Sequence, residues 1–163
     1  KKIFKVLVFG FSTFSSAATL PLNLDTTNKE LGVDRQIASF VLPLGMTINM
    51  DGTAIMQVVA TLFIAGCGGY DVTVVQLVII MVLALIASMG TPAAPGAGAV
   101  ILFTILSGVG FTGEQALIAY TLILAINRPI EMLVTSLNCV GDALTAIAVG
   151  KSEGKLDEDI YNS

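Results

Sequence analysis

The chain has 163 residues, of which 55% are hydrophobic and 12% are charged, and its formal net charge is −4. Soluble domains carry about 25% charged residues, so this composition excludes an ordinary water-exposed surface and indicates a protein of the lipid bilayer. There is no histidine, and the two cysteines show neither a disulfide framework nor metal-ligand spacing. A soluble helical subunit buried in a larger assembly is the alternative, and we expect no nucleic-acid partner.

The first apolar block, 3–24, is interrupted by small residues. We expect a short helical arm over 3–13, a break at Ser15–Pro21 and a second short arm. The second block, 33–66, exceeds the roughly 20 residues that a membrane-spanning helix needs. It contains a break of its own at Asn49–Gly52, in the middle of the span. The sequence therefore predicts a hairpin followed by a broken transmembrane helix.

The third apolar block, 72–110, contains the clearest interruption. Two prolines and three glycines lie within the nine residues Gly90–Gly98 and cannot continue a helix. The arm that follows, Ala99–Val109, has 11 residues and reaches only about 16 Å, roughly half of the hydrocarbon thickness. We therefore expect the chain to turn back at membrane depth as a second re-entrant hairpin. The fourth block, 115–150, is predicted as one long transmembrane helix.

Loop charges agree with this topology. With both hairpins re-entrant, every Lys and Arg except Arg128 falls on one side, while the opposite loops carry only Asp71 and Glu114. Because positive loops favour the cytoplasmic side, we expect a polar cytoplasmic tail over 151–163. The predicted fold class is an all-α membrane protein with inverted repeats, in which each of two re-entrant hairpins precedes a long transmembrane helix and only the first helix is broken. Its expected segments, within a transport-domain core over 1–150, are 1–32, 33–66, 72–110 and 115–150.

Three acidic residues lie inside apolar helices. A charge there costs roughly 2.5–3.5 kcal/mol, so Asp51, Glu131 and Asp142 each need a partner. Asn138 lies four residues before Asp142 and on the same helix face, and carboxylate, amide and backbone oxygens suit a hard cation such as sodium. Structural roles are the alternatives: a helix cap for Asp51 and a contact between helices for the Asn138–Asp142 pair. Arg128 and Glu131, three residues apart, could likewise form only a structural ion pair.

Four motifs occur in one order along the chain: the run Leu42–Thr53 and the segments Ser15–Pro21, Gly90–Gly98 and Asn138–Asp142. Together they resemble the dicarboxylate/amino acid:cation symporter family, which includes the glutamate transporters. The resemblance covers essentially the whole chain. It implies an elevator-type secondary active transporter of the plasma membrane, usually a homotrimer. This segment would form the core of the moving transport domain, preceding scaffold helices would supply the trimer contacts, and the second hairpin would act as the extracellular gate.

The resemblance implies three sodium sites and no organic cofactor. The first site would use Asp142 and Asn138 with backbone at Gly45 and Asn49. The third would use Asp51 with partners outside this segment. The second would lie under the second hairpin and would use the carbonyls of Ser88, Met89 and Thr91 together with Thr47 and Met50.

The resemblance also implies where a substrate binds. Its α-carboxylate would sit on backbone amides of the hairpin tips, and its ammonium on Glu131, where amino-acid carriers hold an aspartate. Val134 stands where carriers of acidic amino acids have an arginine. Phe14, in the first tip, stands where some members of the family also have an arginine. The expected substrate-binding residues are Ser15, Ser16, Thr53, Ala94, Gly98, Glu131, Val134, Thr135 and Asn138.

Val134 favours a neutral substrate, because valine cannot replace a bidentate guanidinium–carboxylate contact. We therefore expect a transporter rather than an enzyme, one that couples sodium to symport of a small, neutral amino acid across the bilayer. A symporter of acidic amino acids or dicarboxylates, coupled to sodium or protons, is the main alternative. Remoter alternatives are an intramembrane aspartyl protease that uses Asp51 and Asp142, a channel, and a relative that binds its ligand without transporting it.

Overall fold

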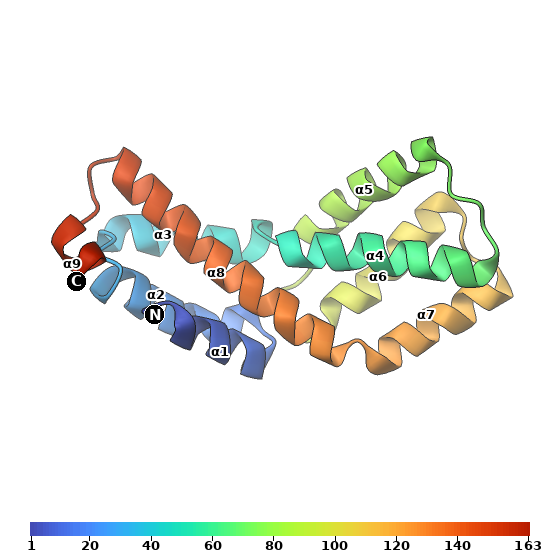
Figure 1. Ribbon diagram of the computed structural model, residues 1–163, viewed down its shortest axis with the longest axis horizontal. Helices are drawn as coiled ribbons and strands as arrows, with labels where there is room; N and C mark the ends of the chain where they lie inside the picture. Colours follow the sequence, from blue (N-terminus) through green and yellow to red (C-terminus); the bar gives the residue numbers. More distant parts are fainter.

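The structure, a computed structural model, describes residues 1–163 and is built from helices, with one isolated β-bridge between Val33 and Leu156. All helices are of the α type, and their arrangement is shown in Figure 1. In chain order they are α1 (Phe4–Thr13), α2 (Ser16–Lys29), α3 (Arg35–Ile48), α4 (Asp51–Gly68), α5 (Val74–Met89), α6 (Ala97–Val109), α7 (Glu114–Ile126), α8 (Arg128–Ser152) and α9 (Glu158–Asn162).

The molecule is elongated, and its helices run broadly along its length (Figure 1). The α2–α3 turn and both chain termini lie toward one end, whereas the α4–α5 and α6–α7 loops lie at the other. The α1–α2 and α5–α6 turns, by contrast, lie near the middle. The two hairpin tips are therefore placed where α3 gives way to α4 and where α8 passes through the centre.

The first hairpin turn is shorter than expected. The break comprises Phe14 and Ser15, which lie between α1 and α2, rather than the whole of Ser15–Pro21. Ser15 caps α2 by accepting a hydrogen bond from the backbone N–H of Ala18 at 3.2 Å. Pro21 lies inside α2, where it removes one backbone donor without ending the helix. One serine cap is thus sufficient to restart the helix immediately after the turn.

The fourth apolar block is divided, which corrects the expected continuous helix over 115–150. α7 and α8 separate at Asn127 and run in different directions from that point (Figure 1). Pro129 explains the division, because it has no N–H to donate and its ring clashes with the carbonyl of Ala125, four residues earlier. The carbonyl of Asn127 instead accepts the N–H of Glu131 at 3.0 Å. The last two helices are therefore a kinked pair, and α8 alone crosses the centre of the molecule.

The other two interruptions lie where the sequence places them. Asn49 and Met50 separate α3 from α4, and Asp51 is the first residue of α4 rather than its cap. Between Met89 and Ala97 the chain forms no helix, so α6 begins two residues earlier than the expected Ala99. Both interruptions free backbone groups near the middle of the molecule, which is where a ligand could use them.

Two apolar clusters stabilise the two halves of the molecule, and α2 adds a polar layer to the half that holds the smaller cluster. The larger cluster joins α4, α5, α6 and α7, and its fully buried members include Ile64, Ile80, Leu102, Ile105 and Leu106. The smaller cluster joins α3 and α8 and consists of Val33, Ala38, Val41, Leu42 and Ala146. The polar layer is the buried face of α2, which carries Ser16, Thr19, Asn23, Thr26 and Thr27.

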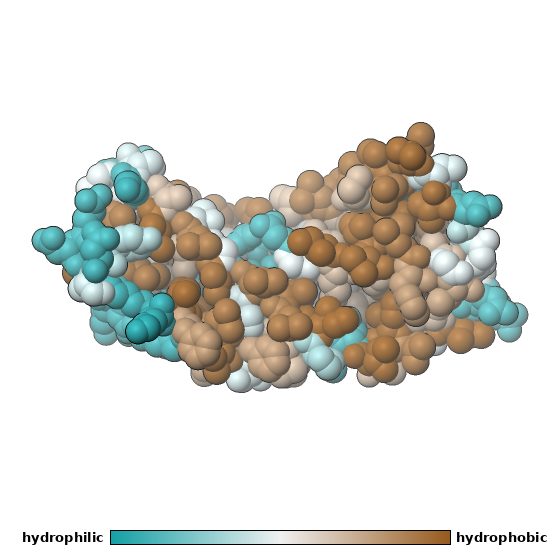
Figure 2. All heavy atoms as spheres, viewed as in Figure 1, coloured by the Kyte–Doolittle hydropathy of each residue, from teal (hydrophilic) through white to brown (hydrophobic).

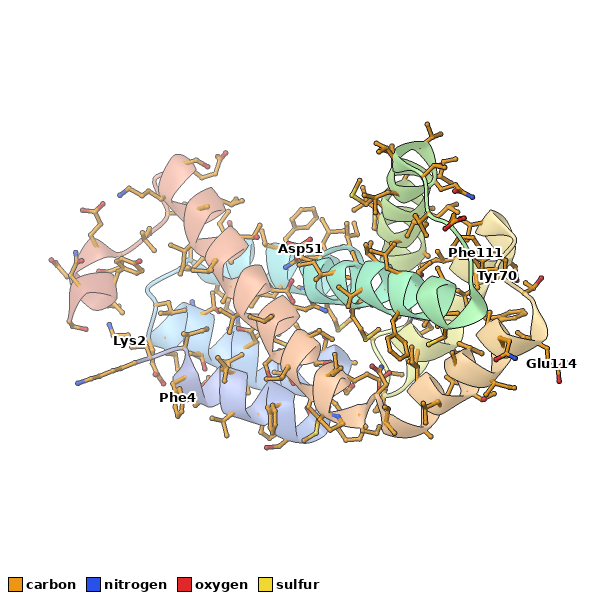
Figure 3. All side chains as sticks on the ribbon, turned by 45° about the vertical axis from the view of Figure 1, so that its right-hand side comes forward. Lys2, Phe4, Asp51, Tyr70, Phe111 and Glu114 are labelled. Atoms are coloured by element: carbon orange, nitrogen blue, oxygen red, sulfur yellow. The ribbon has the colours of Figure 1, made fainter.

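Apolar side chains cover most of the visible surface between two polar ends (Figure 2). Lys2 lies at one end and Glu114 at the other, whereas Asp51 lies midway (Figure 3). Two helical stretches, Arg35–Gly68 and Arg128–Ser152, are long and apolar enough to cross a membrane by length and composition. The surface thus has the apolar band between polar ends that the composition predicts.

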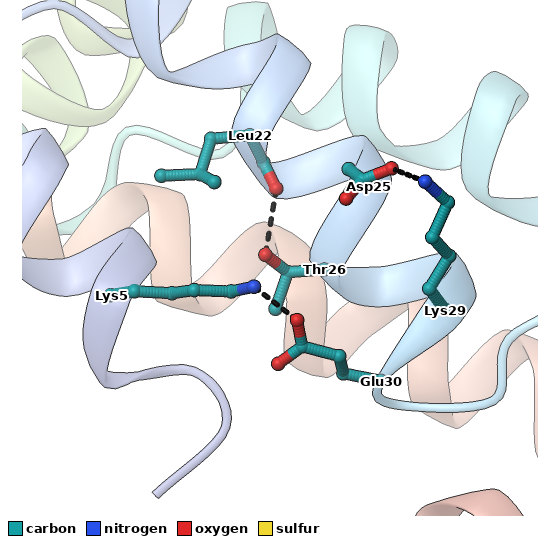
Figure 4. Close-up of polar contacts among 6 residues, drawn as sticks. All are labelled: Lys5, Leu22, Asp25, Thr26, Lys29 and Glu30. Carbon is teal, nitrogen blue, oxygen red and sulfur yellow. Dashed lines mark hydrogen bonds and ion pairs between the residues drawn. The ribbon is translucent and has the colours of Figure 1, made fainter.

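Ion pairs at one polar end hold the first hairpin together. Lys5 of α1 pairs with Glu30 at the end of α2, and Lys29 pairs with Asp25 at 2.5 Å (Figure 4). All four side chains are largely accessible to solvent, so each pair stabilises the fold by only about 0–1 kcal/mol. The packing of this hairpin therefore depends on its buried side chains, which are polar on α2 and include the apolar Val6 on α1.

Candidate functional site

The two hairpin tips touch each other in the middle of the molecule. The hydroxyl of Ser15, in the α1–α2 turn, donates a hydrogen bond to the carbonyl of Ala93 at 2.9 Å. The backbone N–H of Ala17 donates to the same oxygen at 3.5 Å. Ala93 belongs to the α5–α6 turn, so the two tips jointly cover the facing sides of α4 and α8.

A cavity of about 30 Å³ lies beneath the tips, with room for about two water molecules. Eight of the nine residues expected to bind substrate line it, and the ninth, Ser15, makes the contact between the tips. The eight are Ser16, Thr53, Ala94, Gly98, Glu131, Val134, Thr135 and Asn138.

Glu131 is the only acidic residue of this cavity, and it is buried. One carboxylate oxygen, Oε2, lies 3.3 Å from Nη1 of Arg128. The other, Oε1, has no hydrogen-bond partner. A buried acceptor without a partner costs about 1–3 kcal/mol, and more when it is charged. The carboxylate is therefore poised to receive a hydrogen-bond donor, and a cationic donor best of all.

Val134 gives the cavity an apolar side. It packs against the start of α4, where a Cβ at Gly52 would lie only 2.9 Å from the Cβ of Val134. Any larger residue at Gly52 would push the two helices apart. The close approach holds Val134 beside Thr53 and Asn138 in the cavity lining. No positive group therefore reaches the cavity from position 134.

Asn138 joins α8 to the start of α4. Its side-chain oxygen accepts the backbone N–H of Gly52 at 2.9 Å, and its amide donates to the hydroxyl of Thr53 at 3.2 Å. The N–H of Gly52 is one of the helix-start donors that have no partner within the helix, so the asparagine satisfies it. This buried amide fixes the distance between α4 and α8 directly under the cavity.

Asp142 lies one turn further along α8 in a second polar cluster. Its Oδ1 accepts a hydrogen bond from Nδ2 of Asn49 at 2.9 Å, and the carbonyl of Asn138 accepts one from the same nitrogen at 3.4 Å. A Cβ at Gly45 would lie 2.5 Å from Oδ1 of Asp142, so only glycine allows α3 to approach this closely. The structure brings together all four residues expected for the first sodium site.

The residues expected for the second sodium site lie at the end of α3, at the α3–α4 junction and at the end of α5, and α3 contacts α5. Met50 and Thr91 both line the cavity. Thr47, however, is exposed, and its hydroxyl donates to a carbonyl of its own helix at 2.8 Å. The carbonyl of Ser88 accepts the N–H of Thr91 at 3.0 Å, and Met89 is 47% exposed.

Asp51, expected at a third sodium site, is exposed on the outside of the α3–α4 junction (Figure 3). It occupies the first turn of α4, where the partial positive charge of the helix N-terminus stabilises a carboxylate. Asp51 therefore stabilises the start of α4 from its first turn, and it is not the helix cap considered as its structural role. Among the other residues expected at sodium sites, only Thr47 and Met89 are also exposed.

The sequence interpretation missed five residues that line the cavity. Three of them belong to the same tip as the expected Ala94 and Gly98, so the whole tip could have been included. Another lies three residues after Thr53 and on the same helix face, a spacing that could have identified it. The five residues are Phe14, Met56, Pro92, Ala93 and Gly96.

A helical core in which two hairpin tips meet above a buried carboxylate has the discontinuous helices that are typical of membrane transporters. Residues 1–152 match the family described as the Sodium:dicarboxylate symporter family. The chain belongs to this family, which confirms the resemblance seen in its motifs. The family is one of transporters and not of enzymes.

The curated relatives carry names of one kind. The Excitatory amino acid transporter of Caenorhabditis elegans is 38% identical over 156 residues, which are 95% of this chain and 30% of the relative. The human Excitatory amino acid transporter 2 is 38% identical over 95% of this chain and 26% of its own length. The human Excitatory amino acid transporter 5 is 39% identical over 88% of this chain and 25% of its own length. The chain thus spans less than a third of the length of these relatives.

Proposed function

We propose that the protein containing this chain is a sodium-coupled symporter of an acidic amino acid. The family description names sodium and dicarboxylates, and the similar relatives are named excitatory amino acid transporters. These names do not support the neutral substrate expected from Val134 and favour the acidic alternative instead. The absence of an arginine at position 134 then means that a side-chain carboxylate is bound by another group.

The observation that carries this proposal is the unpaired oxygen of Glu131 in the cavity under the tips. An amino acid brings an ammonium group with three donors, which would satisfy Oε1 and neutralise the carboxylate. The tips would hold the substrate from the other side through their backbone. A pure dicarboxylate has no such donor and would face the negative charge of Glu131, so an amino acid fits this site better.

The cluster around Asp142 is the site that we assign to a coupling sodium ion. Its ligands would be the carboxylate of Asp142 and backbone or amide oxygens of Gly45, Asn49 and Asn138, a donor set that suits a hard cation. Asn138 contacts this cluster through its carbonyl and the cavity through its side chain, which bonds to Thr53. An ion that orders Asn138 would therefore favour substrate binding, and by linkage the substrate would favour the ion.

The Gly90–Gly98 tip would act as the gate. The cavity holds about two water molecules, far less than the volume of an amino acid, so a substrate enters only if a tip withdraws. The contact between the tips is a pair of hydrogen bonds to the single carbonyl of Ala93. A glycine- and proline-rich segment held by so few bonds can move without unfolding the helices on either side.

The membrane arrangement that we propose has two re-entrant hairpins in inverted repeats and a cytoplasmic tail. α1, α5 and α6 have 10, 16 and 13 residues, fewer than the roughly 20 that a span requires. The mid-molecule position of both tips supports re-entrance (Figure 1). We further propose a plasma-membrane homotrimer in which this core moves as an elevator against scaffold helices, as the family resemblance implies.

The test is uptake by the full-length protein in liposomes, with labelled aspartate and labelled serine supplied separately. We expect concentrative uptake of aspartate when sodium is high outside, and none when potassium replaces sodium. Serine should compete weakly. Sodium-driven uptake of serine but not of aspartate would contradict the acidic substrate. Uptake of aspartate driven by a proton gradient alone would contradict sodium coupling.

A further inference from the structure

A substrate with a side-chain carboxylate is bound most strongly when a cation lies in or beside the cavity, because ionised hydrogen bonds are the strongest that such a group can form. Val134 cannot supply one. The other basic residues of the chain lie in the segments 1–5, 29–35 and 151–155, toward one polar end of the molecule. Arg128 is the single exception, since it begins α8 next to the cavity.

Three contacts place the guanidinium of Arg128 at the rim of the cavity. Its Nη1 lies 3.3 Å from Oε2 of Glu131, and its Cζ lies 5.4 Å from the centre of the Phe14 ring. A Cβ at Gly96 would lie 3.3 Å from the same Nη1. Glu131, Phe14 and Gly96 all line the cavity, so the guanidinium touches its wall from outside.

A larger cavity of about 410 Å³ adjoins the first and is lined by Arg128 itself. The two cavities share Pro92, Gly96 and Glu131, so the Arg128–Glu131 ion pair stands between them. The Arg128 side chain is 57% exposed, so its guanidinium can leave Oε2 of Glu131 without leaving a buried site.

We propose that Arg128 is the specificity-determining residue that binds the side-chain carboxylate of the substrate. This inference rests on the proposed function. The substrate's ammonium takes the unpaired Oε1 of Glu131 and neutralises the carboxylate, and the guanidinium then leaves Oε2 to pair with the substrate's side-chain carboxylate. One ion pair becomes two, and neither protein charge is left without a partner at any stage.

Phe14 and Gly96 position the guanidinium for this exchange. Phe14 is the only non-glycine residue with a positive φ, at 39°, and such strain is retained where the surroundings require one orientation of a side chain. Its ring offers the face on which a guanidinium stacks. Gly96 has a φ of 83°, and any side chain there would crowd Nη1 as well as strain the turn. Phe14 of the first tip and Gly96 of the second tip thus both limit the orientation of the guanidinium.

The experiment compares aspartate with its amide isostere asparagine in sodium-driven uptake by the full-length protein. In the wild type we expect a strong preference for aspartate. Arg128→Ala should raise the KM for aspartate about tenfold or more and leave the KM for asparagine within about twofold, because only the carboxylate loses its charged partner. Arg128→Lys keeps the charge but loses the two-pronged hydrogen bonding of the guanidinium, so its KM for aspartate should lie between those of the wild type and Arg128→Ala. Arg35→Ala, at the polar end, is the matched control and should behave as the wild type.

The preference between two substrates is read within one variant, so it does not depend on how much protein folds. Loss of the preference in Arg128→Ala supports the proposal. An unchanged preference, or equal losses for aspartate and asparagine, overturns it while leaving the proposed function intact. A wild type that shows no sodium-driven aspartate uptake overturns the proposed function and the role of Arg128 together.

Discussion

Glu131 and Asp142 lie on the same helix but meet different partners. Glu131 faces the cavity with one oxygen unpaired. Asp142 is held by the amide of Asn49 and lies against the backbone of Gly45. The first arrangement suits a ligand that brings its own hydrogen-bond donors, whereas the second suits a bare cation surrounded by oxygen atoms. We therefore expect Glu131 to bind the substrate and Asp142 to bind the cation, and each role can be tested separately.

Glu131→Gln keeps the size of the side chain and removes its charge. We expect a loss of affinity for aspartate of about tenfold or more, because the ammonium loses its charged partner. Inhibition by succinate, which has no ammonium, should not weaken. The measurement is competition against labelled aspartate in liposomes. Equal losses for aspartate and succinate would show that Glu131 does not bind the ammonium.

Gly45→Ala tests the ion site without touching a ligand side chain. The added Cβ would lie 2.5 Å from Oδ1 of Asp142 and must displace that carboxylate. We expect the sodium concentration for half-maximal uptake to rise about tenfold or more, since a shift of this size costs at least the strength of one charged contact. Gly66→Ala is the matched control, because nothing lies within 4 Å of a Cβ there. An unchanged sodium dependence in Gly45→Ala would refute the assignment of this site.

At the scale of residues, the sequence predicted the candidate site best where a family motif specifies each position. Eight of the nine expected substrate residues share one cavity. It was least informative for Arg128, which no motif assigns to the site. Its placement depends on the α7–α8 kink and on the Phe14 ring, and contacts between residues so far apart in the chain leave no trace in the local pattern. The second expected sodium site depends on backbone carbonyls, and a sequence does not specify the directions in which carbonyls point.

At the scale of elements, α2 buries a polar face instead of an apolar one. Its fully buried Asn23 donates from Nδ2 to the carbonyl of Cys139 in α8 at 2.8 Å. From the α8 side, the hydroxyl of Ser136 donates to the carbonyl of Leu7 in α1 at 3.0 Å. Hydrogen bonds therefore help to fix the first hairpin against α8, alongside the apolar contacts of Leu20 and Leu24 with the smaller cluster. In a bilayer such bonds hold helices together where lipid offers no competing donor.

Asn23→Ala should loosen this hairpin. It leaves the carbonyl of Cys139 without its partner, and we expect a loss of stability of about 1–3 kcal/mol. Thermal unfolding of the purified full-length protein measures it as a lower midpoint. Ser12→Ala is the control: Ser12 is exposed and bonds within its own helix, so its loss should stay within about 0.5 kcal/mol. Identical midpoints for the two variants would contradict the anchoring role of Asn23.

The prolines explain which element boundaries the sequence could predict. Pro92 and Pro95 accompany glycines, and their joint effect predicts the second tip correctly. Pro21 and Pro129 each stand alone in helical sequence. The first is tolerated inside α2, whereas the second divides α7 from α8. A single proline can do either, because the outcome depends on whether neighbouring helices satisfy the freed carbonyl, and tertiary packing decides that.

At the scale of the whole molecule, the polar ends and the apolar band between them are the features that composition predicts best. Every lysine and arginine except Arg128 belongs to segments at one end, whereas Glu114 and the α4–α5 loop that carries Asp71 lie at the other. The positive end is expected in the cytoplasm. The direction of the chain across the bilayer then follows for every loop, including the α4–α5 loop that comes directly after Cys67.

Cys67 provides a test of this orientation. It is exposed, whereas Cys139 is buried. In intact cells we expect a membrane-impermeant thiol reagent to label Cys67 from outside, with Cys67→Ser as the control for labelling elsewhere. A cysteine introduced as Ser163→Cys should react only after the membrane is opened. Labelling of the tail cysteine in intact cells, with Cys67 protected, would reverse the proposed topology.

The central claim is that the substrate cavity under the tips and the neighbouring sodium site at Asp142 are coupled through Asn138. The most direct measurement is calorimetric titration of the purified full-length protein with aspartate at several sodium concentrations, with choline keeping the ionic strength constant. The account predicts that the apparent Kd for aspartate falls steeply as sodium rises, because ion and ligand stabilise the same arrangement of Asn138. It also predicts that this fall is weakened in Gly45→Ala. A Kd that is the same at every sodium concentration would contradict the account.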